Sequence, residues 1–292
     1  MRRFFRWTAI GLGLIVLWLV AVWPPPAWYR THWPSETAFM SMRGRSMGGN
    51  DFPTTRWYRP VSIDSMSRWL PRAAMIGEDT RFLEHSGLDY FAILEAMGYR
   101  RAAFSWDNPR DRAEMNRALG RIWSRRDKLR GASTITQQLA KNLYLSPSRN
   151  PFRKVKEAVT AYRLEAALSK RRILALYLNV AELGPNLWGV EAASQHYFNR
   201  RAARLSAEQS AALVGSLPFP LSSNPGYRPG RMRWRQNLIL RRMRGEAITI
   251  PKVDETDIVE PPPAPPIPIR ESVPAPESMS VDSVVVEPGD SY

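Results

Sequence analysis

The chain has 292 residues, enough for one large domain or two small ones, and it contains no cysteine, which excludes disulfide bonds and thiolate metal sites. Its three histidines, His32, His85 and His196, are too far apart in the sequence to show zinc-ligand spacing. The formal net charge is +15, but residues 251–292 carry nine acids and two bases, so residues 1–250 carry +22 and favour polyanionic partners: nucleic acid, anionic lipid or a phosphorylated substrate.

The N-terminus predicts a membrane anchor. Three arginines within the first six residues precede an uncharged run, residues 7–23, which as a helix would span about 26 Å, close to the thickness of a bilayer core. Trp7 and Trp23 stand at the ends of this run, where interfacial aromatic residues are favoured. We expect residues 1–23 to form a cytoplasmic arginine cluster and a transmembrane signal-anchor, with a cleaved signal peptide as the alternative. Because such an anchor would place the basic remainder of the chain outside the cytoplasm, nucleic acid is not expected as a partner.

The next segments differ in composition. Residues 24–60 are rich in Pro, Trp, Arg and Gly and predict a juxtamembrane stalk with little regular structure. Helical spacing of apolar residues begins near residue 61. Residues 104–130 hold eight basic and four acidic residues, which predicts either a mobile basic loop or a solvated surface helix. Residues 246–292 are rich in proline and acids and predict a disordered tail.

The region between these segments predicts a mainly α fold. Thr134 and Gln137 have capping-box spacing at the start of a helix that runs to about residue 144. Ser206 and Gln209 have the same spacing at the start of another helix. Further helices are expected to begin near Pro151 and to cover residues 170–180 and 190–198. No stretch shows a convincing strand alternation.

Two acids are candidates for sugar chemistry. Glu78 follows the apolar residues 73–77, which could bury its carboxylate and suit it to act as a general base, although an isolated Glu here is otherwise an exposed helix-end acid. Glu157 lies one turn from Arg153, the spacing of an ordinary surface ion pair. Sugar transfer from a lipid diphosphate would release a diphosphate, whose negative charge cations can stabilise. The chain offers three candidate cations for this role: Lys141, Arg149 and Lys154.

Five segments together resemble the motifs of the peptidoglycan glycosyltransferases (glycosyltransferase family 51), which include the transglycosylase domain of class A penicillin-binding proteins and stand-alone monofunctional enzymes. The first family motif, Glu-Asp-x-x-Phe-x-x-His-x-Gly, stands at residues 78–87. The third, Arg-Lys-x-x-Glu, stands at residues 153–157. The second, fourth and fifth stand at residues 131–142, 170–179 and 188–198. The order and number of matches over about 120 residues make chance resemblance negligible.

The resemblance implies a lysozyme-like glycosyltransferase domain over residues 61–245, with a small jaw subdomain near residues 104–130. The implied substrate is lipid II, a disaccharide-pentapeptide on undecaprenyl diphosphate. Glu78 maps to the catalytic base, which would deprotonate the 4-hydroxyl of the acceptor's N-acetylglucosamine for an inverting attack that forms a β-1,4 bond. Glu157 maps to a second essential carboxylate, which would orient Mg²⁺ or Mn²⁺ or cations near the diphosphate; no organic cofactor is implied. The implied substrate-binding residues are Asp79, Phe82, His85, Ser133, Thr134, Gln137, Gln138, Lys141, Asn142, Arg149, Arg153 and Lys154.

The chain resembles the stand-alone enzymes, because a transpeptidase half needs a Lys-Thr-Gly or similar strand that is absent here. The expected partners are lipid II, the growing glycan chain and the bilayer, with other cell-wall synthesis or division proteins as candidates. The expected location is the bacterial cytoplasmic (inner) membrane, single-pass, with the catalytic domain on the periplasmic, extracytoplasmic side. Two alternatives are a lytic, lysozyme-like hydrolase and an inactive membrane-anchored scaffold.

Overall fold

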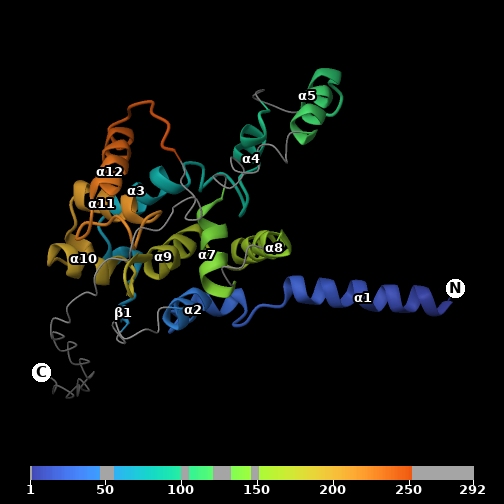
Figure 1. Cartoon of the computed structure of the whole chain (residues 1–292), viewed down its shortest axis with the longest axis horizontal. Coiled ribbons are helices and arrows are strands. Elements are labelled where there is room, and N and C mark those ends of the chain that lie inside the picture. The colour runs from blue at the N-terminus through green and yellow to red at the C-terminus, as the bar shows by residue number, and fades with distance from the viewer. Residues whose placement is uncertain (1, 47–55, 100–104, 121–132, 146–150, 252–292) are drawn as a thin grey trace, which may run out of the picture.

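Most of the chain lies in helices. A computed structural model describes residues 2–46, 56–99, 105–120, 133–145 and 151–251, and helices dominate these ranges (Figure 1). The prediction of a mainly α protein is therefore confirmed, whereas the lysozyme-like architecture stays a prediction.

The N-terminal helix α1 (Arg2–Val20) extends away from the rest of the chain and contacts α8 (Pro151–Ala167) (Figure 1). The sequence predicted a transmembrane anchor that runs to Trp23, but α1 ends three residues earlier. Among the described residues, no helix has the length and apolar content needed to cross a membrane, and the anchor stays a prediction.

The segment expected to be an irregular stalk has structure of its own. It contains the 3-10 helix η1 (Pro26–Arg30) and the helix α2 (Ala38–Ser46). Tyr29 and Met40 are 3% and 1% exposed and belong to the main core. The guanidinium of Arg172 holds this segment to the domain by donating to the carbonyl oxygens of Tyr29 (2.6 Å) and His32 (2.7 Å). Long-range packing, which local composition does not reveal, thus orders part of residues 24–60.

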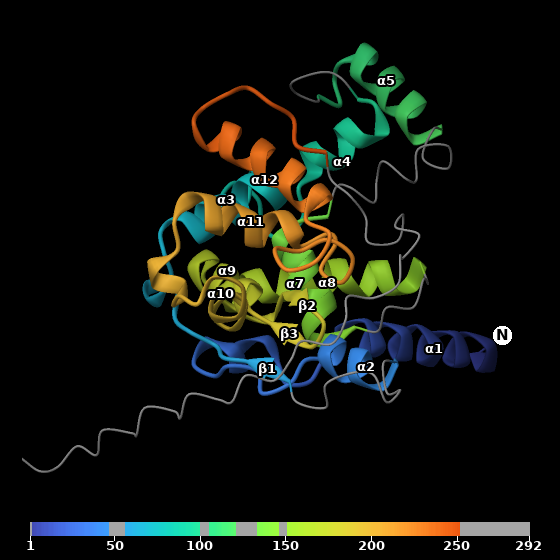
Figure 2. The same cartoon turned by 60° about the vertical axis from the view of Figure 1, so that its left-hand side comes forward.

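The core is built around α9 (Lys170–Val180), whose residues are all buried from Ile173 onward. The helices α7 (Ile135–Tyr144) and α8 both pack against it, and α7 also contacts α2. Figure 2 shows α7, α8 and α9 in the middle of the molecule, with α2 below them and α3, α11 and α12 above. The helix α7 is therefore in contact with α2 from the N-terminal segment as well as with α8 and α9.

A small sheet of three strands lies beside α10 (Val190–Phe198). Its order is β1–β3–β2: β1 (Trp57–Tyr58) is parallel to β3 (Leu187–Trp188), which is antiparallel to β2 (Glu182–Gly184). The sequence did not predict these strands, because two or three residues are too few to show alternation.

The helix α3 (Trp69–Glu78) packs closely on α11 (Ala207–Ser216) and α12 (Gly230–Met243). The close approach occurs at Gly77, where an added Cβ would lie 2.9 Å from Val214 Cγ1 and 3.1 Å from Ile239 Cδ1. Because Gly77 directly precedes Glu78, this contact brings the candidate base to the surface of α12.

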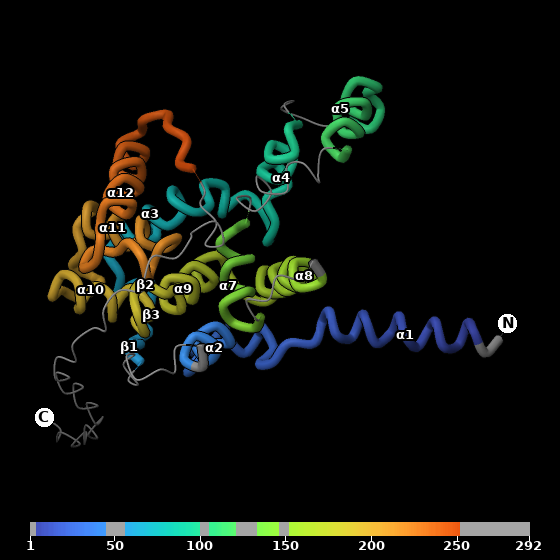
Figure 3. Tube along the Cα trace, in the orientation of Figure 1, coloured from blue at the N-terminus to red at the C-terminus, as the bar shows by residue number. Residues whose placement is uncertain are grey.

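The helices α4 (Tyr90–Met97) and α5 (Pro109–Gly120) lie apart from the main core, where they project to one side (Figures 1 and 3). Met97, Tyr99 and Ala118 form a small hydrophobic cluster of their own. The described part of the predicted jaw therefore contains a helix, and residues 121–130 lie outside the described residues. Two short 3-10 helices, η2 (Ile63–Ser65) and η3 (Ala202–Arg204), complete the fold.

The chain after α12 returns toward the domain as far as Pro251, the last described residue (Figure 1). Arg242 donates to the carbonyl oxygen of Ile248 at 2.7 Å, and Ile250 packs on the main core. Residues 246–251, expected to begin a disordered tail, thus belong to the folded domain. Residues 252–292 lie outside the described residues.

Candidate active site

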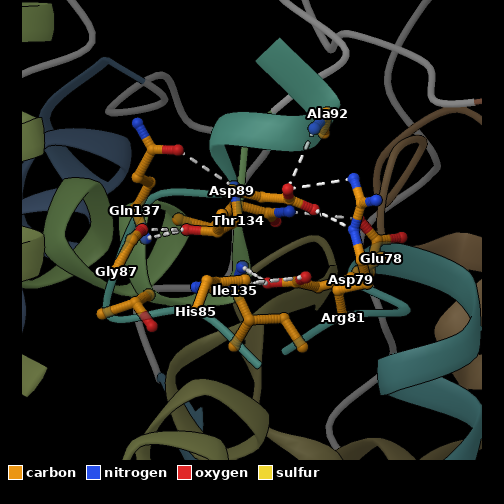
Figure 4. Close-up of polar contacts among 12 residues, drawn as sticks. Glu78, Asp79, Arg81, His85, Gly87, Asp89, Ala92, Thr134, Ile135 and Gln137 are labelled. Carbon is orange, nitrogen blue, oxygen red and sulfur yellow. Dashed lines mark hydrogen bonds and ion pairs between the residues drawn. The ribbon is translucent and has the colours of Figure 1, made fainter. Parts of the chain in front are cut away.

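The loop after α3 is fixed to the start of α7 by a buried acid. Asp79, 2% exposed, accepts a hydrogen bond from the backbone N–H of Ile135 at 2.9 Å, and its Oδ2 lies 3.0 Å from His85 Nε2 (Figure 4). An N–H in the first turn of a helix has no partner inside the helix, so a carboxylate there satisfies it and interacts favourably with the helix dipole. Asp79 therefore joins two motifs that are 56 residues apart.

Thr134 makes the second connection between these segments. Its hydroxyl accepts from the backbone N–H of Gln137 at 3.1 Å, and the Gln137 side chain accepts from the N–H of Thr134, so the predicted capping box is confirmed. The same hydroxyl donates to the carbonyl oxygen of Gly87 at 2.6 Å. Gly87 has φ +98°, and an added Cβ would lie 3.1 Å from the backbone of Ala161. A glycine suits this position for both reasons.

Glu78 ends α3 and is buried, with 7% of its surface exposed. Its Oε1 accepts from Arg235 Nη2 at 2.8 Å, and its Oε2 accepts from Gln138 Nε2 at 3.1 Å. The amide of Gln138 is in turn bonded through its Oε1, which accepts from the hydroxyl of Tyr177 at 3.0 Å. The elements α3, α7 and α12 thus meet at this carboxylate, and α9 is connected to it through Gln138.

A second charged group lies at the start of α8. Glu157 is 2% exposed; its Oε2 accepts from Arg153 Nη1 at 2.9 Å, and its Oε1 accepts from Lys154 Nζ. The predicted clustering of these three residues is confirmed. The group differs from an ordinary surface ion pair because Glu157 is buried, and an acid out of water needs its charge compensated. Lys154 Nζ also donates to Ser133 Oγ at 2.9 Å, directly before α7.

The helix α7 connects the two groups. Lys154 contacts Ser133 at its start, and Glu78 contacts Gln138 five residues later. The buried acid and the Lys154 cation therefore both contact the segment that starts at Ser133 and continues as α7.

Several predicted substrate-binding residues are instead buried against each other. Phe82, Thr134 and Gln137 are at most 4% exposed, and Asp79 and His85 bind one another. Lys170 supports the same loop, since its ammonium lies 4.5 Å from the Phe82 ring centroid and donates to the carbonyl oxygen of His85. These bonds give the residues a part in shaping the site, and their contact with substrate stays a prediction.

The remaining predicted residues lie along α7 or outside the described residues. Lys141 is half-buried, with its ammonium 5.7 Å from the Phe39 ring centroid, and Asn142 is 8% exposed. Arg149 lies outside the described residues.

The sequence analysis missed Arg235 and gave Tyr177 no role. One signal could have identified Arg235: it occupies a position on the buried stripe of α12, between Met232 and Ile239, where an apolar residue is expected. A charged residue on such a stripe points to a buried partner.

Comparisons with known proteins show which family the chain is similar to. The family model described as Transglycosylase matches residues 102–244, a range that begins after Glu78. The chain is 38% identical to the biosynthetic peptidoglycan transglycosylase of Bordetella pertussis (strain Tohama I), over 79% of this chain and 87% of the relative. It is 36% identical to the protein of the same name from Azoarcus sp. (strain BH72), over 80% and 98%, and 33% identical to that of Thiobacillus denitrificans, over 86% and 100%.

Proposed function

The chain belongs to the biosynthetic peptidoglycan transglycosylase family, and on that premise we propose that it polymerises lipid II into β-1,4-linked glycan strands, releasing undecaprenyl diphosphate with inversion at the anomeric carbon. The observation that carries the proposal is the pairing, along one helix, of a buried carboxylate with a cluster of cations. The reaction needs one group to accept a proton and others to stabilise a departing diphosphate.

In this reaction Glu78 is the general base. It takes the proton from the 4-hydroxyl of the acceptor sugar as that oxygen attacks the anomeric carbon of the donor. The new C–O bond forms while the bond between the anomeric carbon and the diphosphate oxygen breaks. Burial of Glu78 excludes competing water from the carboxylate, and the hydrogen bonds to Arg235 and Gln138 fix its orientation.

The departing diphosphate is stabilised by cations on α7 and at the start of α8. Lys154 contacts Ser133 and shares Glu157 with Arg153, and Lys141 lies in the last turn of α7. We also assign Arg149 to this group, on its place between α7 and α8 in the sequence. Glu157 holds Arg153 and Lys154 in place, because each of its two oxygens accepts from one of them.

The sequence also suggested that Glu157 orients a divalent cation through the lipid diphosphate. Both carboxylate oxygens of Glu157 are already bonded to cationic groups, and the described residues contain no cluster of three His, Cys, Asp or Glu that could hold a metal ion. The oxygens of Glu157 therefore do not fit a metal ion bound by the protein, and no step of the reaction is assigned to a metal. The dependence on Mg²⁺ or Mn²⁺ stays a prediction, checked by adding EDTA to the assay.

We place the reaction at a membrane surface, because the polyprenyl chain of the substrate stays in the bilayer, and on the extracytoplasmic side of the bacterial cytoplasmic membrane, because the relatives are named as peptidoglycan synthesis enzymes. The positive charge of residues 1–250 suits anionic headgroups and the lipid diphosphate. The acidic C-terminal tail is a candidate contact for other cell-wall synthesis proteins.

Incubation with lipid II and, separately, with finished glycan tests the proposal. We expect polymer and free undecaprenyl diphosphate from the first and no products from the second. Fragments released from finished glycan, without polymerisation, would instead identify a hydrolase, which needs an acid to protonate a neutral leaving oxygen. No reaction with either would identify an inactive scaffold.

A further inference from the structure

The carboxylate of Glu78 is held from two sides by residues that are too deeply buried to touch a substrate. Arg235 bonds one oxygen directly, and Tyr177 acts on the other through Gln138. Arg235 and Tyr177 are each 1% exposed. Neither belongs to the sets of residues assigned above to proton transfer or diphosphate binding.

Arg235 is itself fixed by backbone. Its Nη2 donates to the carbonyl oxygen of Gly77 at 2.7 Å as well as to Glu78, and its Nη1 donates to the carbonyl oxygen of Pro251 at 2.6 Å. A guanidinium is planar and presents its donors in a rigid fork. Because one backbone carbonyl oxygen binds Nη1 and another binds Nη2, the Nη2 donor is held at one position relative to Glu78.

Stability alone does not account for an arginine at this place. A buried ion pair often contributes less than apolar residues of the same size would, because both charges must lose their water. The pairing is also incomplete, since Arg235 Nε is buried and has no hydrogen-bond partner among the described residues. The neighbouring buried positions of α12, Met232 and Ile239, are apolar and show what packing alone would favour here.

On the opposite side, Tyr177 sets the direction of the Gln138 amide. The tyrosine hydroxyl donates to Gln138 Oε1, so the Nε2 end of the amide faces Glu78 Oε2. Gln138 is partly exposed, whereas Arg235 is fully buried. Of the two oxygens, Oε2 is therefore the one whose partner has exposed surface, and a carboxylate oxygen that accepts one hydrogen bond can accept another.

We propose that Arg235 and Tyr177 are positioning residues that hold the Glu78 carboxylate so that Oε2 takes the proton from the acceptor hydroxyl. This inference rests on the proposed function. The returning C-terminal segment takes part in it, because the carbonyl of Pro251 completes the fixation of Arg235.

Two conservative substitutions test the inference in the full chain. Arg235→Lys keeps the charge but cannot bond Glu78, Gly77 and Pro251 together, and Tyr177→Phe removes only the hydroxyl. Because small misplacements of a reacting group cost up to about 100-fold in rate, we expect each to lower kcat for lipid II by about 10- to 100-fold with KM within about twofold. The control is Arg241→Lys on the same helix, whose exposed guanidinium pairs with Glu246; it keeps wild-type kcat.

The double variant separates positioning from general damage. If both residues act through Glu78, their effects on kcat are less than multiplicative, whereas independent damage at two places would multiply. A folded Arg235→Lys or Tyr177→Phe with wild-type kcat, or with a raised KM and unchanged kcat, would overturn the inference. If Arg235→Lys does not fold, Tyr177→Phe decides alone. Wild-type protein that does not polymerise lipid II would refute the proposed function, a different outcome.

Discussion

The connection between the Glu78 loop and α7 can be tested with Thr134→Val. Valine has the shape of threonine, so the substitution removes only the hydroxyl. That hydroxyl caps α7 through the N–H of Gln137 and donates to the carbonyl oxygen of Gly87, at a residue with no exposed surface. Both bonds are lost, and no water is available to replace them.

The expected cost follows from these two contacts. Losing an N-cap costs about 1 kcal/mol, and leaving a buried carbonyl without a partner costs about 1–3 kcal/mol more. The free energy of unfolding is therefore expected to fall by about 2–4 kcal/mol. For a domain of this size that lowers the melting temperature by about 5–15 °C.

Thermal and urea unfolding measure this cost, and the chain provides a matched control. Ser206 caps α11 in the same way, but its hydroxyl donates to the exposed Glu208 and not to a buried carbonyl. Ser206→Ala is therefore expected to cost only the cap, about 1 kcal/mol. Equal losses in the two variants would show that the bond from Thr134 to Gly87 contributes nothing, and the inferred connection between the two segments would be wrong.

Two further predictions concern Lys154 and Tyr29. Lys154→Met removes a charge-assisted contact and is expected to weaken binding of a labelled lipid diphosphate by about 10-fold or more. The control, Lys156→Met, makes an equal charge change on α8 and is expected to have little effect on this binding. Equal losses of affinity in the two variants would show that Lys154 contributes only to the general positive charge of the surface. Burial raises the pKa of Tyr29 to about 12, so the stability that its protonated form provides is complete below about pH 10 and is lost as the pH rises toward about 12. Tyr29→Phe should flatten this alkaline fall in urea unfolding, and an unchanged fall would contradict the assignment.

Local rules predicted the parts of the site that depend on nearby residues. The capping box of Thr134 and Gln137 and the clustering of Arg153, Lys154 and Glu157 involve neighbours within one or two helical turns, and both are confirmed. Motif spacing also led to the right family.

Contacts between distant parts of the chain were not predictable in this way. The bond from Arg235 to Glu78 crosses 157 residues, and that from Asp79 to the start of α7 crosses 56. The strands of the sheet are too short to show a period, and η1 and α2 are ordered by packing against the core. Each depends on which surfaces meet after folding, which local composition does not specify.

The most direct test of the account is the rate of lipid II polymerisation by Glu78→Gln, measured against wild type at a temperature where both are folded. Glutamine keeps the shape of the side chain and can still accept from Arg235, but it cannot take a proton. We predict that the variant unfolds cooperatively like wild type and loses at least about 100-fold in rate, the usual contribution of a general base. Polymerisation at a near wild-type rate by the folded variant would show that another group accepts the proton.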